Sequence, residues 1–296
     1  MRFNLYTDVK VFYKDTRDVL MRHEAQNLIP LGNIIIGNEG KDKAGWRDSA
    51  AWFMATVTND SGILLTAIMT PPHNLTLYAT NNKIRDDALK CLVEGLIAGD
   101  IIVPGVMTEN SLAERFAGAW SAAAKTSYTI ESKMRIYELF KVNPAIPLFG
   151  KMRLLEDKDL SFFPYWLEGF NADCFGDMPT PKPNLETYKY FVNKKKVYVL
   201  EHEGTEVSMA QKNREMQTVC GVSMVYTPPY FRGKGYASSV VAQLSRMILE
   251  QGFTKCVLYT DLANPVSNSI YQKIGYVPIG DSLTIKFGDA DQYRRE

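Results

Sequence analysis

Two segments in the second half of the chain combine residue types that can do chemistry. The first runs from Val225 to Ala237, reads VYTPPYFRGKGYA, and lies between a β-rich run and an amphipathic helical pattern. Gly233 and Gly235 leave no side chain where backbone N–H groups meet a ligand, and the positive end of the following helix attracts an anion. Arg232 and Lys234 add two full positive charges. The segment therefore predicts an anion-binding turn, although a solvated strand-to-helix turn has the same composition.

Two common nucleotide-binding motifs do not fit this loop. One requires GxxxxGK[ST] and the other GxGxxG, whereas the chain has GKGYAS from Gly233 to Ser238. The sequence therefore disfavours ATP and NAD as ligands.

The second segment runs from Asn264 to Tyr276 and reads NPVSNSIYQKIGY. Asn264 as N-cap, Pro265 at the first helical position and Gly275 as terminator predict a helix over 265–274. At about 100° per residue, one stripe of this helix is polar and the opposite stripe is apolar. The polar stripe holds Asn264, Ser267, Asn268 and Tyr271, and the apolar stripe holds Val266, Ile270 and Ile274. The pattern predicts that one face of the helix meets the core and the other faces a site. In the alternative, Asn264 only caps the helix and Tyr271 is an aromatic residue at the rim.

Together the two segments resemble the GNAT superfamily of acyl-CoA-dependent N-acetyltransferases. That family has the loop motif Q/R-x-x-G-x-G/A after its fourth strand, and a later helix with N-x-x-S-x-x-x-Y before G-F/Y. Gly233 and Gly235 match the loop motif, and Tyr230 stands where the family usually has Gln or Arg. The second motif is matched by Asn264, Ser267, Tyr271, Gly275 and Tyr276. The resemblance covers about 151–287 and implies an α/β fold with a mixed sheet and two GNAT-like domains in tandem.

The resemblance implies acetyl-CoA as cosubstrate. The residues expected to bind it are Val225, Tyr226, Thr227, Arg232, Gly233, Lys234, Gly235, Tyr236, Ala237, Asn264 and Ser267. The pantetheine arm would pair with Val225 and Thr227, and the Val225 N–H would donate to the acetyl carbonyl as an oxyanion donor. Pro228 and Pro229 have no N–H, which predicts that this strand loses its ladder with the strand of Val257, so that a gap opens for the arm.

Tyr271 is the expected catalytic residue. Attack by an amine gives a tetrahedral intermediate that expels the CoA thiolate, and a Tyr pKa of about 10 against a thiol pKa of about 8.5 lets Tyr271 donate its proton. An amine with a Lys-like pKa of about 10.4 also needs a base or a water chain, which the sequence does not identify. Glu215 and Asp261 are candidates that fit solvated carboxylates better. Because neither motif contains a cysteine, direct transfer is expected rather than a covalent acyl-enzyme.

The acceptor side is indicated by an aromatic segment from Phe162 to Asp177, with acids at Asp173 and Asp177, and by the proline-rich run Met178 to Pro183. A stiff loop of this kind could cover a cationic amine, and the expected acceptor is a small-molecule primary amine. Helical spacing gives most of the aromatics a plain core role instead; it joins Phe163, Trp166, Leu167 and Phe170. A CoA-binding regulatory or scaffold protein with a decayed acceptor site is the alternative function, against which Tyr271 argues, and a relative that transfers another acyl group is a third.

The elements that position these residues form two similar series. The first series has strands at 50–57, 62–69 and 75–79, a helix at 84–98, a strand at 100–103, a helix at 111–120 capped by Ser111, and a strand at 134–140. The second has strands at 196–201, 206–211 and 217–226, a helix at 233–251, a strand at 256–260, a helix at 265–274 and a strand at 283–287. Prolines between Val142 and Pro147 place the domain boundary after residue 143. We expect 1–143 to be a degenerate GNAT-like domain, since Asn81 to Ile84 replaces the phosphate loop, and 144–296 to be the catalytic domain.

Composition excludes several other classes. The 296 residues suit about two domains of roughly 150 residues each, and 46% hydrophobic with 23% charged residues is ordinary for a globular protein. A net charge of +1 predicts neither a nucleic-acid nor a membrane partner. The spacing of 4 Cys and 3 His predicts no metal site. No signal-like start and no apolar run of about 18 residues occur, so a cytoplasmic location is expected.

Overall fold

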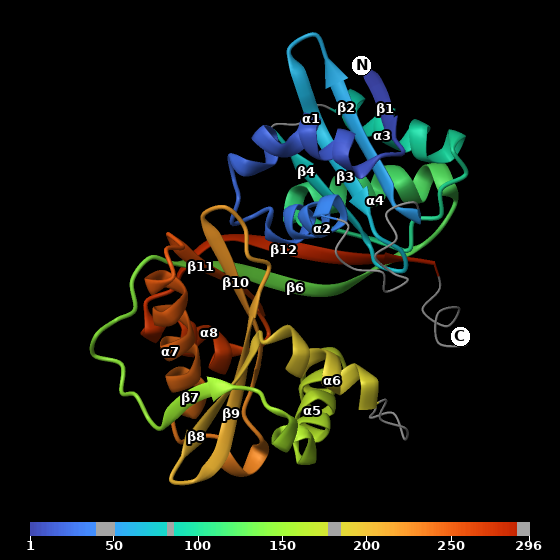
Figure 1. Cartoon of the computed structure of the whole chain (residues 1–296). Helices are drawn as coiled ribbons and strands as arrows, with labels where there is room; N and C mark the ends of the chain where they lie inside the picture. Colours follow the sequence, from blue (N-terminus) through green and yellow to red (C-terminus); the bar gives the residue numbers. More distant parts are fainter. Residues whose placement is uncertain (40–50, 82–85, 177–184, 289–296) are drawn as a thin grey trace. The chain divides into compact units, whose positions relative to one another are not determined.

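The computed structural model describes residues 1–39, 51–81, 86–176 and 185–288, and the chain divides into two compact units (Figure 1). The first unit contains Met1–Ile136, Asp261–Ala263 and the segment from Ile279 onward. The second contains Tyr137–Thr260 and Asn264–Pro278. A single boundary after residue 143 does not describe this division, because the first unit also takes up the end of the chain's last strand.

The elements of the first half are β1 Arg2–Tyr6, α1 Val9–Met21, α2 Leu28–Glu39, β2 Phe53–Asn59, β3 Gly62–Met69, β4 Leu75–Ala79, α3 Asp86–Ala98, β5 Gly105–Glu109, α4 Asn110–Ala124 and β6 Tyr128–Leu139. Those of the second half are β7 Lys151–Leu154, the 3₁₀ turn η3 Asp157–Ser161, α5 Phe163–Phe175, α6 Leu185–Lys194, β8 Val197–His202, β9 Thr205–Asn213, β10 Val219–Tyr226, the 3₁₀ turn η4 Pro229–Phe231, α7 Tyr236–Glu250, β11 Lys255–Asp261, α8 Pro265–Ile274 and β12 Val277–Phe287. Apart from the 3₁₀ turns, both halves follow the same order, β-α-α-β-β-β-α-β-α-β.

The sheet of the first unit is mixed. Strands β1 to β4 pair in sequence order and antiparallel, and β4 pairs parallel with β5 through Leu75 and Val106. β12, the final strand of the second half, pairs antiparallel with β5 from Ser282 opposite Glu109 to Lys286 opposite Gly105. Apolar residues of α3 and α4 cover one face of this sheet, and α1 and α2 supply buried residues of their own.

The first unit also corrects two details of the sequence analysis. Residues 100–103 are not a strand, and the strand lies at Gly105–Glu109, where β12 provides a hydrogen-bonding partner. The N-cap of α4 is Glu109 rather than Ser111, because the Glu109 carboxylate accepts the N–H groups of Ser111 and Leu112 at 3.0 and 3.1 Å. The predicted strands at 62–69 and 75–79 coincide with β3 and β4, whereas β1, α1 and α2 were not predicted.

The second unit has helices on both faces of its sheet (Figure 1). Strands β7 to β10 pair antiparallel in sequence order, and β10 pairs parallel with β11. One core cluster joins α7 and α8 to β8, β9 and β10 through residues such as Val222 and Val241. The other joins α5 and α6 to the opposite face through residues such as Trp166 and Tyr226. The predicted α/β fold with a mixed sheet is confirmed.

Candidate functional site

The central backbone feature of the second unit is a bulge in β10. Ser223 lies opposite Gln211 and Tyr226 opposite Met209, so that three steps along β10 match two along β9. Within this interval Met224 has a φ of +53°, which is unusual for a residue with a side chain. An extra residue in one strand bends that strand and increases its twist. The bulge therefore redirects the carboxyl end of β10.

The parallel ladder between β10 and β11 opens at this point. Pairing stops at Gly221 and Val257, although β10 continues to Tyr226 and β11 continues beyond Val257 as well. The predicted gap is present, but its predicted cause was wrong. Pairing ends at Gly221, upstream of Pro228 and Pro229, so the missing proline N–H groups do not decide where the strands separate; the bulge lies between that point and the end of β10.

One residue of β10 presents its backbone to the open edge. The Tyr226 carbonyl accepts the Ser208 hydroxyl of β9 at 3.0 Å, so the polar groups of Tyr226 face β9. Successive residues of a strand alternate direction, so Val225 presents its N–H and C=O toward β11. The carbonyl of Thr227, also expected to meet the pantetheine arm, is already engaged because it accepts Arg232 Nε at 2.9 Å. We therefore expect Val225, the residue between the Met224 kink and Tyr226, to be the stronger candidate for a backbone contact with a bound ligand.

The glycine turn after β10 has the backbone that close ligand approach requires. Gly233 and Gly235 have φ of +76° and +83°, and α7 begins at Tyr236 rather than at the predicted Gly233. The first hydrogen bond of α7 runs from the Ser239 N–H to the Gly235 carbonyl at 3.0 Å. The N–H groups of Tyr236, Ala237 and Ser238 therefore precede the helical ladder, as at the start of any helix. This end of α7 can accept an anion.

The two basic residues of the turn point to different surroundings. Arg232 Nη2 contacts Asp173 Oδ2 of α5 at 2.5 Å, and its guanidinium lies 5.8 Å from the centre of the Tyr226 ring. Lys234 Nζ lies 4.9 Å from the centre of the Tyr230 ring, which is 80% exposed. The Tyr226 side chain itself packs under α5. Arg232 is therefore held toward α5, and Lys234 lies on the outer side of the turn.

Polar residues at the start of α8 hydrogen-bond one another and form its N-terminal cap. Asn264 Oδ1 accepts the Ser267 N–H at 3.0 Å, so Asn264 acts as the predicted N-cap. Asn268 Nδ2 donates to the Asn264 carbonyl at 2.7 Å, and Asn268 Oδ1 accepts the Tyr137 hydroxyl at 2.9 Å. These bonds tie the helix start to the end of β6.

The predicted division of α8 into a core face and a site face was wrong in part. Val266, assigned to the core, is 68% exposed, while Tyr271, assigned to the polar stripe, is buried with Ile274 in the core cluster. The face that meets the core is rotated because α8 packs Tyr271 against Tyr137 of β6 and Tyr276, with ring centres 6.3 and 5.9 Å apart.

The surroundings of Tyr271 keep its phenol protonated. Burial raises the pKa of Tyr271 far above its ordinary value, and the nearby Cys174 thiol at the end of α5 adds to the rise. A proton donor must hold its proton at neutral pH until the leaving group develops charge. Tyr271 therefore holds its proton at neutral pH, while the raised pKa makes the phenol a weaker acid than a solvated tyrosine, and Cys174 in the last turn of α5 acts on it electrostatically.

The candidate bases are engaged elsewhere. Glu215 contacts Lys212 at 3.0 Å and Lys196 at 3.1 Å. Burial raises its pKa while both lysines lower it, and the net pKa lies below the ordinary value, which makes Glu215 a weak base. Asp261 accepts the Ala263 N–H at 2.7 Å and belongs to the first unit.

The aromatic segment supplies core residues, since Phe163, Trp166 and Leu167 are buried. Asp177 and residues 178–183 lie outside the described residues.

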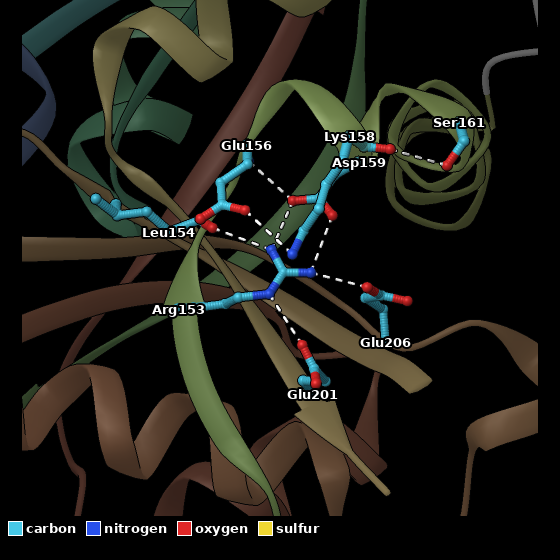
Figure 2. Close-up of polar contacts among 8 residues, drawn as sticks. All are labelled: Arg153, Leu154, Glu156, Lys158, Asp159, Ser161, Glu201 and Glu206. Atoms are coloured by element: carbon cyan, nitrogen blue, oxygen red, sulfur yellow. Dashed lines mark hydrogen bonds and ion pairs between the residues drawn. The ribbon is translucent and has the colours of Figure 1, made fainter. Parts of the chain in front are cut away.

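An arginine that the sequence did not single out holds the segment before α5 in place. Figure 2 shows Arg153 of β7 among three carboxylates: Asp159 at 2.7 and 2.9 Å, Glu201 at 3.1 Å and Glu206 at 2.8 Å. Asp159 is only 1% exposed and also accepts the Glu156 N–H at 2.8 Å. The hydrogen bonds to Asp159 raise the pKa of Arg153, and so do those to Glu201. The cluster fixes η3, and with it the start of α5, on β8 and β9; its members are too far apart in sequence to form a motif.

The described residues contain neither a metal-binding cluster nor a membrane-spanning helix. Within the described ranges, no three His, Cys, Asp or Glu side chains gather closely enough to hold a metal ion. No helix in that part of the chain has the length and apolar character needed to cross a membrane.

Comparison with known proteins places this geometry in a family context. Residues 202–283, which include the bulge, the glycine turn and α8, match the model of the FR47-like protein family. No curated protein matches the whole sequence closely enough to count as a relative.

Solved structures resemble the chain over nearly its whole length. A Drosophila protein has a TM-score of 0.63 at 13% identity, covering 96% of this chain and 97% of its own. A GCN5-related N-acetyltransferase from Sphaerobacter thermophilus has a TM-score of 0.61 at 12% identity, covering 96% of this chain and 95% of its own. A GNAT-family acetyltransferase from Colwellia psychrerythraea has a TM-score of 0.57 at 12% identity, covering 98% of this chain and 100% of its own. The chain has the GNAT acetyltransferase fold. Within that fold, the opened β10–β11 edge and the start of α7 lie in the segment that matches the FR47-like family.

Proposed function

We propose that this chain is an N-acetyltransferase that moves the acetyl group of acetyl-CoA to the primary amine of a small molecule. The observation that carries the proposal is the bulge in β10, which follows the end of pairing with β11 at Gly221 and exposes the backbone of Val225. A bulged edge beside an uncapped helix start offers amide donors for a thioester arm and for its phosphates at neighbouring places. The GNAT fold of the chain supports acyl transfer over other uses of such an edge.

The phosphates of acetyl-CoA would meet the N–H groups at the start of α7. Gly233 and Gly235 bring the backbone close to the ligand, and Tyr236 and Ala237 supply N–H groups outside the helical ladder. Lys234 adds a positive charge on the outer side of the turn. Asn264 and Ser267 contribute by shaping the start of α8, since the Asn264 amide oxygen is used as its N-cap.

The acetyl carbonyl would accept a hydrogen bond from the Val225 N–H. The neutral amine attacks the carbonyl carbon and gives a tetrahedral oxyanion, which this N–H stabilises. As the C–S bond breaks, the electron pair leaves on sulfur and Tyr271 transfers its proton to that thiolate. The amine nitrogen loses its extra proton to solvent, directly or through a chain of water, because Glu215 is paired with two lysines. The Tyr271 phenolate then takes up a proton from solvent, and the products are an amide and free CoA.

Tyr271→Phe tests the chemical step. The change keeps the buried ring and removes only the phenolic proton, so kcat should fall about 100-fold while the dissociation constant of acetyl-CoA stays nearly the same. Calorimetric titration with acetyl-CoA measures binding, and release of CoA thiol with a panel of tyramine, spermidine and glucosamine measures turnover. Tyr276→Phe is the matched control, because it removes a buried hydroxyl that bonds Ser245 at 2.8 Å and keeps the ring that packs against Tyr271. A kcat within twofold of wild type in Tyr271→Phe would remove Tyr271 as the acid.

The same measurements separate the proposal from its rivals. Tight binding of acetyl-CoA without thiol release for any amine would favour a CoA-binding regulatory protein. Faster turnover with propionyl-CoA or succinyl-CoA than with acetyl-CoA would retain the GNAT chemistry and change the acyl group. The proposal of an N-acetyltransferase would fail in either case.

A further inference from the structure

One ion pair joins the loop before α7 to the last turn of α5. Arg232 Nη2 lies 2.5 Å from Asp173 Oδ2, while Arg232 Nε donates to the Thr227 carbonyl at the end of β10. The guanidinium also lies over the Tyr226 ring. Arg232 therefore extends from the turn that would hold the phosphates to the face of the sheet that α5 covers.

The bond between Arg232 and Asp173 is easily exchanged. Their side chains are 47% and 50% exposed, and ion pairs at such exposed positions contribute little because water and salt screen them. The bond from Nε to Thr227 does not depend on Asp173, so the side chain stays anchored if Nη2 changes partner. A diphosphate at the start of α7 would offer Nη2 more negative charge and a charge-assisted hydrogen bond. The diphosphate would thus displace the carboxylate.

Asp173 occupies a position where a free carboxylate would attract a cation. It lies in the last turn of α5, where the helix dipole disfavours a negative side chain, so the carboxylate gains from a positive partner. The next residue, Cys174, acts electrostatically on the Tyr271 phenol. One turn earlier, Gly169 lets α5 approach the Tyr226 ring. Asp173 therefore contacts the phosphate turn through Arg232, and the residue next to it acts on the proposed proton donor.

We propose that Asp173 and the diphosphate of acyl-CoA compete for Arg232, so that cofactor binding frees the Asp173 carboxylate to bind the ammonium group of the acceptor. This inference rests on the proposed function and adds a substrate class to it: the acceptor is cationic when it binds. Before the cofactor arrives, Arg232 neutralises Asp173 and the amine has little to recognise. Afterwards Asp173 holds the amine beside the acetyl group, and solvent removes its proton before attack.

Binding of acetyl-CoA tests the competition without any amine. Asp173→Asn frees Arg232, so the dissociation constant of acetyl-CoA should fall about threefold to fivefold, up to the strength of an exposed ion pair. Arg232→Gln should raise it, and Asp173→Asn should have no further effect in the Arg232→Gln background. S-acetylpantetheine has no phosphate, so its affinity should not respond to either change. Glu168→Gln is the matched control, since Glu168 is a carboxylate of the same helix that bonds Tyr188.

Steady-state kinetics test the second half of the inference. At saturating acetyl-CoA, Asp173→Asn should raise KM for spermidine, or for the best amine of the panel, at least tenfold. In Asp173→Asn the dissociation constant of acetyl-CoA would then fall while the KM for the amine rises, a combination that a general loss of structure does not produce. Asp173→Glu keeps the charge and should restore most of the amine KM.

The outcomes are decisive in each direction. Unchanged or weaker binding of acetyl-CoA by Asp173→Asn, or an equal effect of Asp173→Asn with and without Arg232, would overturn the competition. An unchanged amine KM would overturn the role of Asp173 in amine binding. In both cases the wild-type protein would still bind and transfer acetyl, so the proposed function would stand. A wild-type protein that does not bind acetyl-CoA would overturn both.

Discussion

Substituting the two turn glycines separately tests whether the shape of the loop before α7 makes the acyl-CoA site. Both residues have positive φ, +76° at Gly233 and +83° at Gly235, so alanine at either position introduces the same backbone strain, about 1–2 kcal/mol. Their surroundings differ. A Cβ at Gly233 meets nothing within 4 Å, whereas a Cβ at Gly235 lies 2.9 Å from Phe149 Cε2. Phe149 has little room to retreat because its N–H and carbonyl bond the Ser239 hydroxyl of α7, at 2.8 and 2.9 Å, and its ring packs edge-on against those of His202 and Tyr236.

Gly235→Ala therefore adds an overpacking term of about 1–3 kcal/mol that Gly233→Ala lacks. The turn can relieve this only by moving the N–H groups at the start of α7 away from their places. We expect Gly235→Ala to raise the dissociation constant of acetyl-CoA at least tenfold, which is about 1.4 kcal/mol, and Gly233→Ala, which lacks the contact with Phe149, to raise it less. Gly235→Val should be at least as severe.

Calorimetric titration measures both constants, and circular dichroism with thermal unfolding shows that the variants are folded. The double variant Gly235→Ala with Phe149→Ala removes the ring that causes the clash and should recover part of the lost affinity. Equal affinities for folded Gly233→Ala and Gly235→Ala would refute the reasoning, because the contact with Phe149 would then have no effect on the ligand. Wild-type affinity in Gly235→Val would place the acyl-CoA site elsewhere.

Three other predictions follow from buried groups and from the repeated element order. Arg153→Met should destabilise the protein by about 3–5 kcal/mol in chemical unfolding, because Asp159 would remain buried and unpaired, and adding Asp159→Leu should recover stability if that reason is right. Burial raises the pKa of Cys220 and Cys256 to about 12, so above pH 9 both thiols stay protonated in the folded state while they ionise in the unfolded state. The free energy of unfolding should therefore be full below about pH 9 and fall as the pH rises toward 12. The double variant Cys220→Ala with Cys256→Ala should flatten that fall. Calorimetric titration should give one acetyl-CoA per chain, and a stoichiometry of two would show that the first unit binds it as well.

Local sequence signals predicted the elements near the site. The strand that became β10, the glycine turn and the boundaries of α8 depend on alternation, on residues that tolerate positive φ and on an N-cap with proline after it, all of which act within a few residues. Helix α2 was missed because it is apolar along most of its length and shows no clear stripe. Helix α1 was not predicted although its buried residues Val9, Phe12, Thr16 and Leu20 follow helical spacing.

Long-range packing decided what the sequence could not show. The bulge at Met224 has no residue signature, since methionine does not favour positive φ, and it is visible only as a shift in register against β9. The orientation of α8 depends on Tyr137, a residue of β6 far away in sequence. Arg232 was predicted as a phosphate ligand from its place beside Gly233, yet its partner Asp173 lies on another helix. In each case the deciding contact joins elements from separate parts of the chain.

The repeated order of elements explains why two similar halves need not make two sites. In the first half, β4 corresponds in order to β10 and pairs with β3 from Leu65 opposite Ala79 to Ile68 opposite Thr76 without any shift in register. The backbone pairing of β4 with β5 also ends early, at Thr76 and Met107, but β4 has no bulge, and the Thr108 hydroxyl of β5 occupies the Leu77 carbonyl of β4 at 2.7 Å. The following helix α3 begins with Asp86 and Asp87, which oppose an anion where α7 offers glycine and lysine. The feature that separates the halves is thus one inserted residue in a strand, together with the charge of the helix that follows it, and both favour the second half for binding acyl-CoA.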